Sequence, residues 1–189
     1  MGRGAGQYGG TPMKLPLGLV LALLWTETLA GAGAAAPTPE QRLAALGLTL
    51  PAVPASVANY VPAVRSGSLV FLAGQIPRRA DGQVLVGKVG RDCTEAQAAD
   101  AARTCALQLL AALKAEVGDL GRVRRIVRVG GFVNCTPDFT AQPKVINGAS
   151  DLLVAVFGER GRHARAAVGV AALPAGAPVE VELVAEIAE

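Results

Sequence analysis

The amino-acid sequence predicts an α+β domain in which a mixed β-sheet carries two helices on one face. Two segments, 94–117 and about 142–157, repeat apolar residues at helical spacing. Short segments rich in β-branched residues precede, separate and follow them, which gives the order β-β-α-β-α-β-β. Hydrophobic residues make up 51% of the chain and aromatic residues only 4%, so the core is built mostly of Ala, Val and Leu. Self-association would cover the apolar residues expected on the open face of the sheet.

Residues 1–36 differ in composition from the rest of the chain, and we exclude them from the fold. Met13-Lys14 precedes an apolar run from Leu15 to Trp25, and a tail of small residues ends at Ala36. These parts are typical of a secretory signal peptide, and the run is too short to span a bilayer comfortably. The alternatives are a mitochondrial or plastid transit peptide, or a spurious extension of a cytoplasmic protein. We expect no membrane segment in the mature form.

Residues 37–58 are expected to form a linker, a short helix and an extended arm. Thr38 is a suitable N-cap, Pro39 fits the first helical position, and Gly47 stops the helix after about Leu46. Prolines interrupt Leu48–Ala58, which predicts an extended conformation there. The remaining residues, 59–189, are expected to form the domain itself.

Two strands begin the domain. The segments Tyr60–Arg65 and Leu69–Gly74 are separated by a turn at Ser66-Gly67. The second segment is a continuous apolar run, which predicts burial on both faces of the sheet. Asp81-Gly82 then predicts a hairpin-like loop.

The segment from Thr94 to Val117 carries the clearest helical pattern. Thr94 occupies the N-cap position, Gln97 the capping-box position, and Gly118 follows the last turn. Its small and apolar residues form one stripe, made of Ala98, Ala101, Cys105, Leu109 and Leu113.

A strand and a second helix follow. The strand is expected over Val123–Asn134, and its Gly130-Gly131 pair predicts a bulge or a close approach of the backbone. The helix is expected from about Gln142 or Pro143 to Phe157, and Gly158 stops it.

The C-terminal part contains two short strands, Ala166–Ala172 and Val179–Ala185, joined by a turn rich in Pro and Gly. We expect them to pair antiparallel as a hairpin. Arg165 precedes the first strand, while Glu180 and Glu182 alternate along the second. A hairpin would place this cation and an acid at one end of the sheet, and alternation points both acids to the same face.

Composition disfavours several kinds of site. The cysteines Cys93, Cys105 and Cys135 lack C-x-x-C spacing, and His163 is the only histidine, so a zinc site would have too few ligands. We expect buried or idle thiols and a surface position for His163. The net charge of +3 is small and the basic residues of the chain are scattered, which counts against a nucleic-acid partner.

Three motifs occur in order along the chain: Ala73-Gly-Gln-Ile-Pro77, Gly131-Phe-Val-Asn134, and a long segment from Ala164-Arg165 to Val179-Glu-Val-Glu182. Together they resemble the Rid (YjgF-type) family, also known as L-PSP endoribonucleases, over roughly Leu46 to Glu186. The chain is most similar to the branch called YjgF/chorismate mutase-like putative endoribonucleases.

The resemblance implies a chorismate-mutase-like fold assembled as a homotrimeric barrel with three clefts at the subunit interfaces. Active members of the family hydrolyse reactive enamines and imines, such as 2-iminopropionate, to 2-oxo acids and ammonia, without a metal or organic cofactor. By this resemblance, Arg165 binds the substrate carboxylate and Glu180 positions the attacking water. Tyr60, Gly74 and Asn147 match other cleft positions, Asn147 only with a one-residue gap.

These residue types suit that chemistry. A guanidinium holds a carboxylate through two parallel hydrogen bonds, and a carboxylate can accept a proton from an attacking water. Each residue also has an ordinary structural interpretation: Arg165 as an interface ion-pair residue, Glu180 as a sheet-edge acid, and Tyr60 as a packed aromatic. The serine often found before the cleft glycine is Ala73 here, so the identity of the substrate is open.

Three functions therefore compete. The first is hydrolysis of 2-imino acids, which makes a 2-imino or 2-oxo acid the expected small-molecule partner. The second is a non-catalytic trimer that binds small carboxylates in the same clefts. The third is an endoribonuclease, which weak basicity and the scarcity of aromatic residues for stacking count against.

Overall fold

The structure is a computed structural model that describes residues 36–53 and 58–188. The extension predicted at 1–36 therefore lies outside the described residues, except for Ala36, and so do residues 54–57 of the arm. Within the described part of the chain, no helix is both long and apolar enough to cross a membrane.

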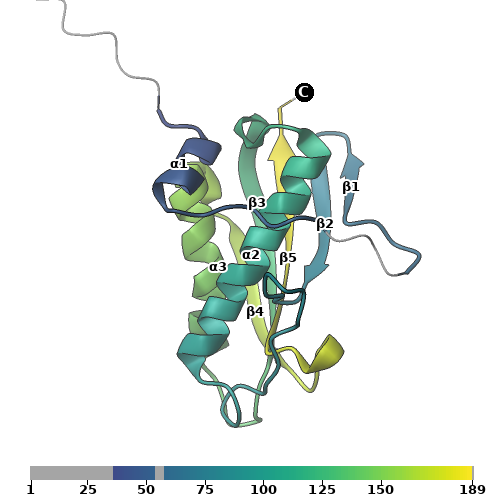
Figure 1. Cartoon of the computed structure of the whole chain (residues 1–189), viewed down its shortest axis with the longest axis vertical. Coiled ribbons are helices and arrows are strands. Elements are labelled where there is room, and N and C mark those ends of the chain that lie inside the picture. Colours follow the sequence, from purple (N-terminus) through teal and green to yellow (C-terminus); the bar gives the residue numbers. More distant parts are fainter. Residues whose placement is uncertain (1–35, 54–57, 189) are drawn as a thin grey trace, which may run out of the picture. The chain divides into compact units, whose positions relative to one another are not determined.

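The predicted order of strands and helices is confirmed, with one short helix in front (Figure 1). Three-residue or four-residue 3-10 turns follow α2, α3 and β4. The elements are α1 (Pro39–Ala45), β1 (Ala63–Ser66), β2 (Leu69–Gln75), α2 (Glu95–Val117), β3 (Val123–Asn134), α3 (Gln142–Phe157), β4 (Ala164–Val170) and β5 (Val179–Ile187).

The helix boundaries follow from capping. Thr38 accepts a hydrogen bond from the backbone of Gln41, whose side chain accepts one from the backbone of Thr38, and Thr94 and Gln97 do the same at the start of α2. The observed strand boundaries differ more from the predicted ones. β1 begins at Ala63 rather than at residue 60, after Pro62, which has no N–H for a ladder.

The five strands form one mixed sheet in the order β1-β2-β5-β3-β4. β3 and β4 are parallel and the other neighbours are antiparallel. The predicted hairpin of the last two strands is therefore wrong, because β3 lies between β4 and β5. After α3 the chain returns parallel to β3 at the edge, and β5 then inserts between β2 and β3.

Both long helices cover one face of the sheet (Figure 1). On β5 the side chains alternate, with every second residue from Val179 to Ile187 buried against the helices. The residues between them, from Glu180 to Glu186, lie on the opposite face, which we call the open face. The core is thus a single layer between helices and sheet.

The prediction that β2 is buried on both faces is wrong. Val70 and Leu72 are buried, but Phe71 points to the open face and is 47% exposed. Val64 on β1 and Val168 on β4 lie on the same face and are 53% and 46% exposed. A continuous apolar run therefore marks a strand whose second face is not covered within one chain.

Glycines let the helices approach closely. A Cβ on Gly131 of β3 would lie 2.5 Å from two side-chain atoms of Ile146, so α3 packs directly on this strand. A Cβ on Gly148 of α3 would overlap the backbone carbonyl of Ala99 on α2. The Gly130-Gly131 pair thus serves close approach, whereas the irregular register of β3 lies nearer its start, between Val123 and Arg128.

Candidate functional site

A cleft opens where β1 stops pairing with β2. β1 pairs with Leu69–Leu72 only, and the register between β2 and β5 shifts after Leu72. The last residues of β2 therefore leave the regular ladder and bend around a cavity of about 490 Å³. A volume of this size is in the range that holds small-molecule ligands. The lining comprises Ala52, Val53, Tyr60, Pro62, Ala73, Gly74, Gln75, Ile76, Arg78, Gln108, Ala112, Pro174 and Glu180.

Glu180 provides the carboxylate of the cleft. It is half-buried on β5, and among the described residues no side chain or backbone group donates a hydrogen bond to it. Burial raises the pKa of its carboxyl group, and the negative charge of Glu182 on the same face raises it further. A carboxylate with a raised pKa and free lone pairs can accept a proton from water.

Gly74 makes room for this carboxylate. A Cβ at position 74 would overlap Oε1 of Glu180 and would lie 3.0 Å from its Cδ. Glu182 has a similar relation to the neighbouring strand on the other side, since a Cβ on Gly130 would lie 2.6 Å from its Oε1. Because Gly74 on β2 and Gly130 on β3 have no side chain, the carboxylates of Glu180 and Glu182 can lie against these two strands.

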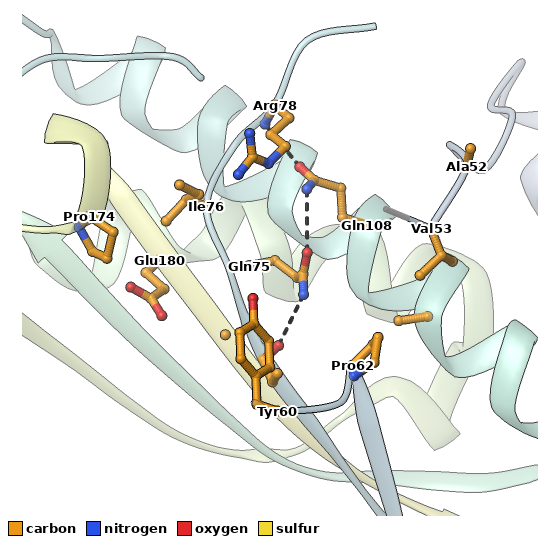
Figure 2. A pocket seen from close by; sticks show the side chains of 13 residues that line it. Ala52, Val53, Tyr60, Pro62, Gln75, Ile76, Arg78, Gln108, Pro174 and Glu180 are labelled. Atoms are coloured by element: carbon orange, nitrogen blue, oxygen red, sulfur yellow. Dashed lines mark hydrogen bonds between the residues drawn. The ribbon is translucent and has the colours of Figure 1, made fainter. Parts of the chain in front are cut away.

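Amide side chains form the middle of the cleft, as Figure 2 shows. Gln108 of α2 is only 7% exposed; it accepts a hydrogen bond from the backbone N–H of Arg78 at 3.0 Å. Its Nε2 donates to Oε1 of Gln75 at 3.5 Å, and Gln75 donates to the carbonyl of Ala73 at 3.3 Å. Gln75 lies in the first motif quoted above, but sequence reasoning gave it no role, and it missed Gln108, although a glutamine inside the apolar stretch of a helix was an available signal.

The two ends of the cleft differ in character. In Figure 2, Glu180 lies at one end, and Ala52 and Val53 from the N-terminal arm lie at the other. Tyr60 stands between them and is 53% exposed, so it lines the cleft and is not a packed core aromatic. Three of the predicted site residues, Tyr60, Gly74 and Glu180, therefore meet in one place.

The other two predicted residues meet elsewhere. Arg165 at the start of β4 donates from Nη1 to Oδ1 of Asn147 at 2.9 Å and to Oγ of Ser150 at 3.0 Å. Asn147 and Ser150 are three residues apart on α3 and so lie on the same face of that helix. Ser150 was missed by sequence reasoning, although its spacing from Asn147 was an available signal.

His163 belongs to this second cluster. It is half-buried, in contrast to the expected surface position, because α3 packs beside it. Its Nδ1 lies 2.6 Å from the carbonyl of Gly161 and its Nε2 lies 3.0 Å from Oγ of Ser150. Burial lowers the pKa of the imidazole, and the nearby cation of Arg165 lowers it further.

Within one chain, Arg165 and Glu180 are far apart. Arg165 is paired with Val129, and Val129 with Leu183, so Arg165 is two strands and three residues from Glu180. At ordinary sheet spacings this is about 10 Å in each direction. Arg165 also points to the helix face and Glu180 to the open face. The expected placement of both at one end of a hairpin is therefore corrected.

Two of the three thiols lie in the core, and the third, Cys93, is partly buried. Cys105 is fully buried in the core, where desolvation raises its pKa well above the ordinary value, and Cys135 is also buried. Among residues 36–53 and 58–188, no group of three or more His, Cys, Asp or Glu side chains could hold a metal ion.

Comparison with known proteins gives consistent results. Residues 40–187 match the family model described as YjgF/chorismate mutase-like, putative endoribonuclease. Protein TCP17 of Trypanosoma cruzi is 49% identical over 143 residues, which are 75% of this chain and 89% of TCP17.

Two solved structures are also similar. Atu1372 of Agrobacterium tumefaciens, a protein of unknown function, is 47% identical with a TM-score of 0.73, over 79% of this chain and 92% of that one. A putative endoribonuclease from Shewanella oneidensis MR-1 is 39% identical with a TM-score of 0.77, over 80% of this chain and all (100%) of that one.

Proposed function

Because the chain belongs to the YjgF/chorismate mutase-like, putative endoribonuclease family, we propose that it hydrolyses reactive 2-imino acids, and the enamines that tautomerise to them, to 2-oxo acids and ammonia. The observation that carries this proposal is the Glu180 carboxylate, half-buried in a cleft against the backbone of Gly74 and without a donor among the described residues. Such a group is placed to activate a water molecule.

The reaction follows from these groups. Glu180 accepts a proton from water while the water oxygen forms a bond to the imine carbon and the C=N electron pair moves to nitrogen, which takes up a proton. The proton that nitrogen takes up is the one that Glu180 accepted from water and passes on. Glu180 then accepts the hydroxyl proton of the tetrahedral intermediate as the C=O bond forms, and it passes this proton to the departing nitrogen, so that both hydrogens of the water leave in ammonia. Imines are intrinsically labile, so positioning of water and substrate contributes much of the rate.

Arg165 is proposed to bind the substrate carboxylate, with Asn147 fixing its guanidinium. Since Arg165 and Glu180 of one chain cannot reach the same small molecule, the complete site would form between two copies, with Arg165 from one and the Glu180 cleft from the other. The exposed apolar side chains Val64, Phe71 and Val168 on the open face support self-association. The family resemblance suggests three copies.

The test is an imine-hydrolysis assay on the full chain, with 2-imino acids generated from amino acids by an oxidase. We expect Arg165→Ala to abolish hydrolysis and Glu180→Gln to leave only a small residual rate, while the oligomeric state is unchanged in both variants. Unchanged activity in either variant would contradict the assigned roles. Tight binding of a 2-oxo acid by calorimetry with no turnover would instead favour the non-catalytic binder.

The name of the family suggests an endoribonuclease as an alternative function. It would be supported by RNA degradation that survives nuclease-free repurification and is lost in Arg165→Ala. The small net charge of +3 and the low aromatic content argue against it.

A further inference from the structure

Hydrogen bonds link Arg165, Ser150, His163 and the carbonyl of Gly161 in a chain. The Gly161 carbonyl at one end of this chain determines which atom donates in the bonds on either side of His163. The carbonyl of Gly161 can only accept, so Nδ1 of His163, 2.6 Å away, carries the proton in neutral imidazole. Nε2 is then an acceptor, and the hydroxyl of Ser150, 3.0 Å away, donates to it. The chain thus requires His163 to be the Nδ1–H tautomer.

The same chain determines how Ser150 meets Arg165. A hydroxyl has one hydrogen and two lone pairs, and its hydrogen is taken by His163. A lone pair of Oγ is therefore turned toward Nη1 of Arg165, 3.0 Å away, and Asn147 holds the same nitrogen at 2.9 Å. Two acceptors on one helix face hold this nitrogen and fix the plane of the guanidinium.

We propose that Ser150 and His163 are positioning residues that hold Arg165 in the orientation in which it binds the carboxylate of a 2-imino or 2-oxo acid, and that His163 does so only when neutral. This proposal rests on the proposed function for the role of Arg165. Neither Ser150 nor His163 is proposed to touch the substrate, because both act through the guanidinium of Arg165.

Protonation of His163 would reverse the hydrogen bond between His163 and Ser150. Nε2 would become a donor, so Oγ of Ser150 would have donors on two sides, from an imidazolium and a guanidinium, and its own hydrogen would lose its acceptor. Two cations would then face one oxygen. The surrounding elements carry further charged side chains, which include Arg128 on β3 opposite Ala164, Asp151 on α3, and the Glu159–Arg162 ion pair beside Gly161. Among the charged side chains of the described residues, the charge of Arg165 on β4 is the one that shifts the pKa of His163.

The first test needs no ligand. His163 is the only histidine in the chain, so its ring nitrogen resonances can be assigned in the intact, nitrogen-15-labelled protein without mutation. We expect the Nδ1–H tautomer at neutral pH, and we expect Arg165→Gln to raise the pKa of His163 by removing the neighbouring cation. An Nε2–H tautomer, or an unchanged pKa in Arg165→Gln, would overturn the proposal.

The second test measures binding of pyruvate by calorimetry as a function of pH. Above the pKa of His163 we expect Ser150→Ala to bind about tenfold more weakly, near the low end of the effect of one hydrogen bond to a charged group. Ser150→Thr, which keeps the hydroxyl, should bind like the wild type. Wild-type affinity should fall as the pH is lowered through the pKa of His163, and His163→Phe should remove this step. Wild-type affinity in Ser150→Ala, or a step that persists in His163→Phe, would overturn the proposal.

The two proposals fail in different ways. If the wild type neither binds pyruvate nor hydrolyses imines, the proposed function fails, and the nitrogen resonances alone decide whether the hydrogen-bond chain exists. If imines are hydrolysed but Ser150→Ala leaves binding and its pH dependence intact, the proposed function stands and the positioning role fails.

Discussion

Replacing Gly74 by alanine would displace Glu180 with little effect on the fold. The φ angle of Gly74 is not in the left-handed region, so alanine fits the backbone. Its Cβ would overlap Oε1 of Glu180 and approach Cγ to 3.2 Å, but these atoms belong to a flexible side chain that can move. We therefore expect the free energy of unfolding to change by less than about 1 kcal/mol.

The effect on activity should be much larger. The carboxylate must move by about 1 Å or more to restore ordinary contact, and a misplacement of this size at a reacting group costs on the order of 100-fold in rate. We expect kcat/KM for 2-iminopropionate to fall about 100-fold in Gly74→Ala. Thermal unfolding of the same samples separates this effect from loss of folded protein.

Two controls make the expectation specific. Gly130→Ala applies a similar push to Glu182, whose Oε1 would lie 2.6 Å from the new Cβ, and should reduce activity less than about tenfold. The double variant Gly74→Ala with Glu180→Gln should be no less active than Glu180→Gln alone, because the glycine acts through this acid. Additive losses, or an equal loss in Gly130→Ala, would refute the assignment of Glu180.

Further predictions concern pH, packing and assembly. The acid limb of kcat/KM should reflect a Glu180 pKa above its ordinary 4.5, and Glu182→Gln should move the limb to lower pH because a like charge is removed; a limb that does not move would contradict this coupling. Because the pKa of Glu180 is raised in the folded protein, its stabilising contribution is present below about pH 4.5 and is lost as the pH rises through the folded-state pKa. Glu180→Gln should therefore raise Tm at pH 7 but not at pH 4. Gly148→Ala would force α2 and α3 apart at a backbone contact, so we expect it to lower the free energy of unfolding by about 3 kcal/mol in denaturant titrations. A change below about 1 kcal/mol would show that the helices can separate easily. If the chain self-associates as proposed, Phe71→Asp should dissociate the oligomer in sedimentation velocity, and an unchanged sedimentation coefficient would exclude the open face as the interface.

Local features of the fold could be predicted from the sequence. The caps Thr38 and Thr94 and the glycines that end α1, α2 and α3 lie where the pattern placed them, because capping involves only residues a few positions apart. The family motifs also identified Gly74 and Glu180, which the structure brings together.

Strand pairing could not be predicted in this way. The turn between β4 and β5 carries ordinary turn residues, yet β4 pairs with β3 and β5 lies two positions away. The choice of partner depends on contacts between residues far apart in sequence, which periodicity does not report. The separation of Arg165 from Glu180 follows from that pairing, and so could not be read from the sequence either.

The central position of β5 has a consequence for biosynthesis. β2 and β3 do not touch each other in the ladder; each pairs with β5, which is translated after every other element of the sheet. On the ribosome, the helices and β1–β2 can form early, but the sheet stays divided until residues 179–187 have emerged. Until then β2 and β3 each present an unpaired edge, which is the state in which a nascent chain is most exposed to misassociation and to capture by chaperones.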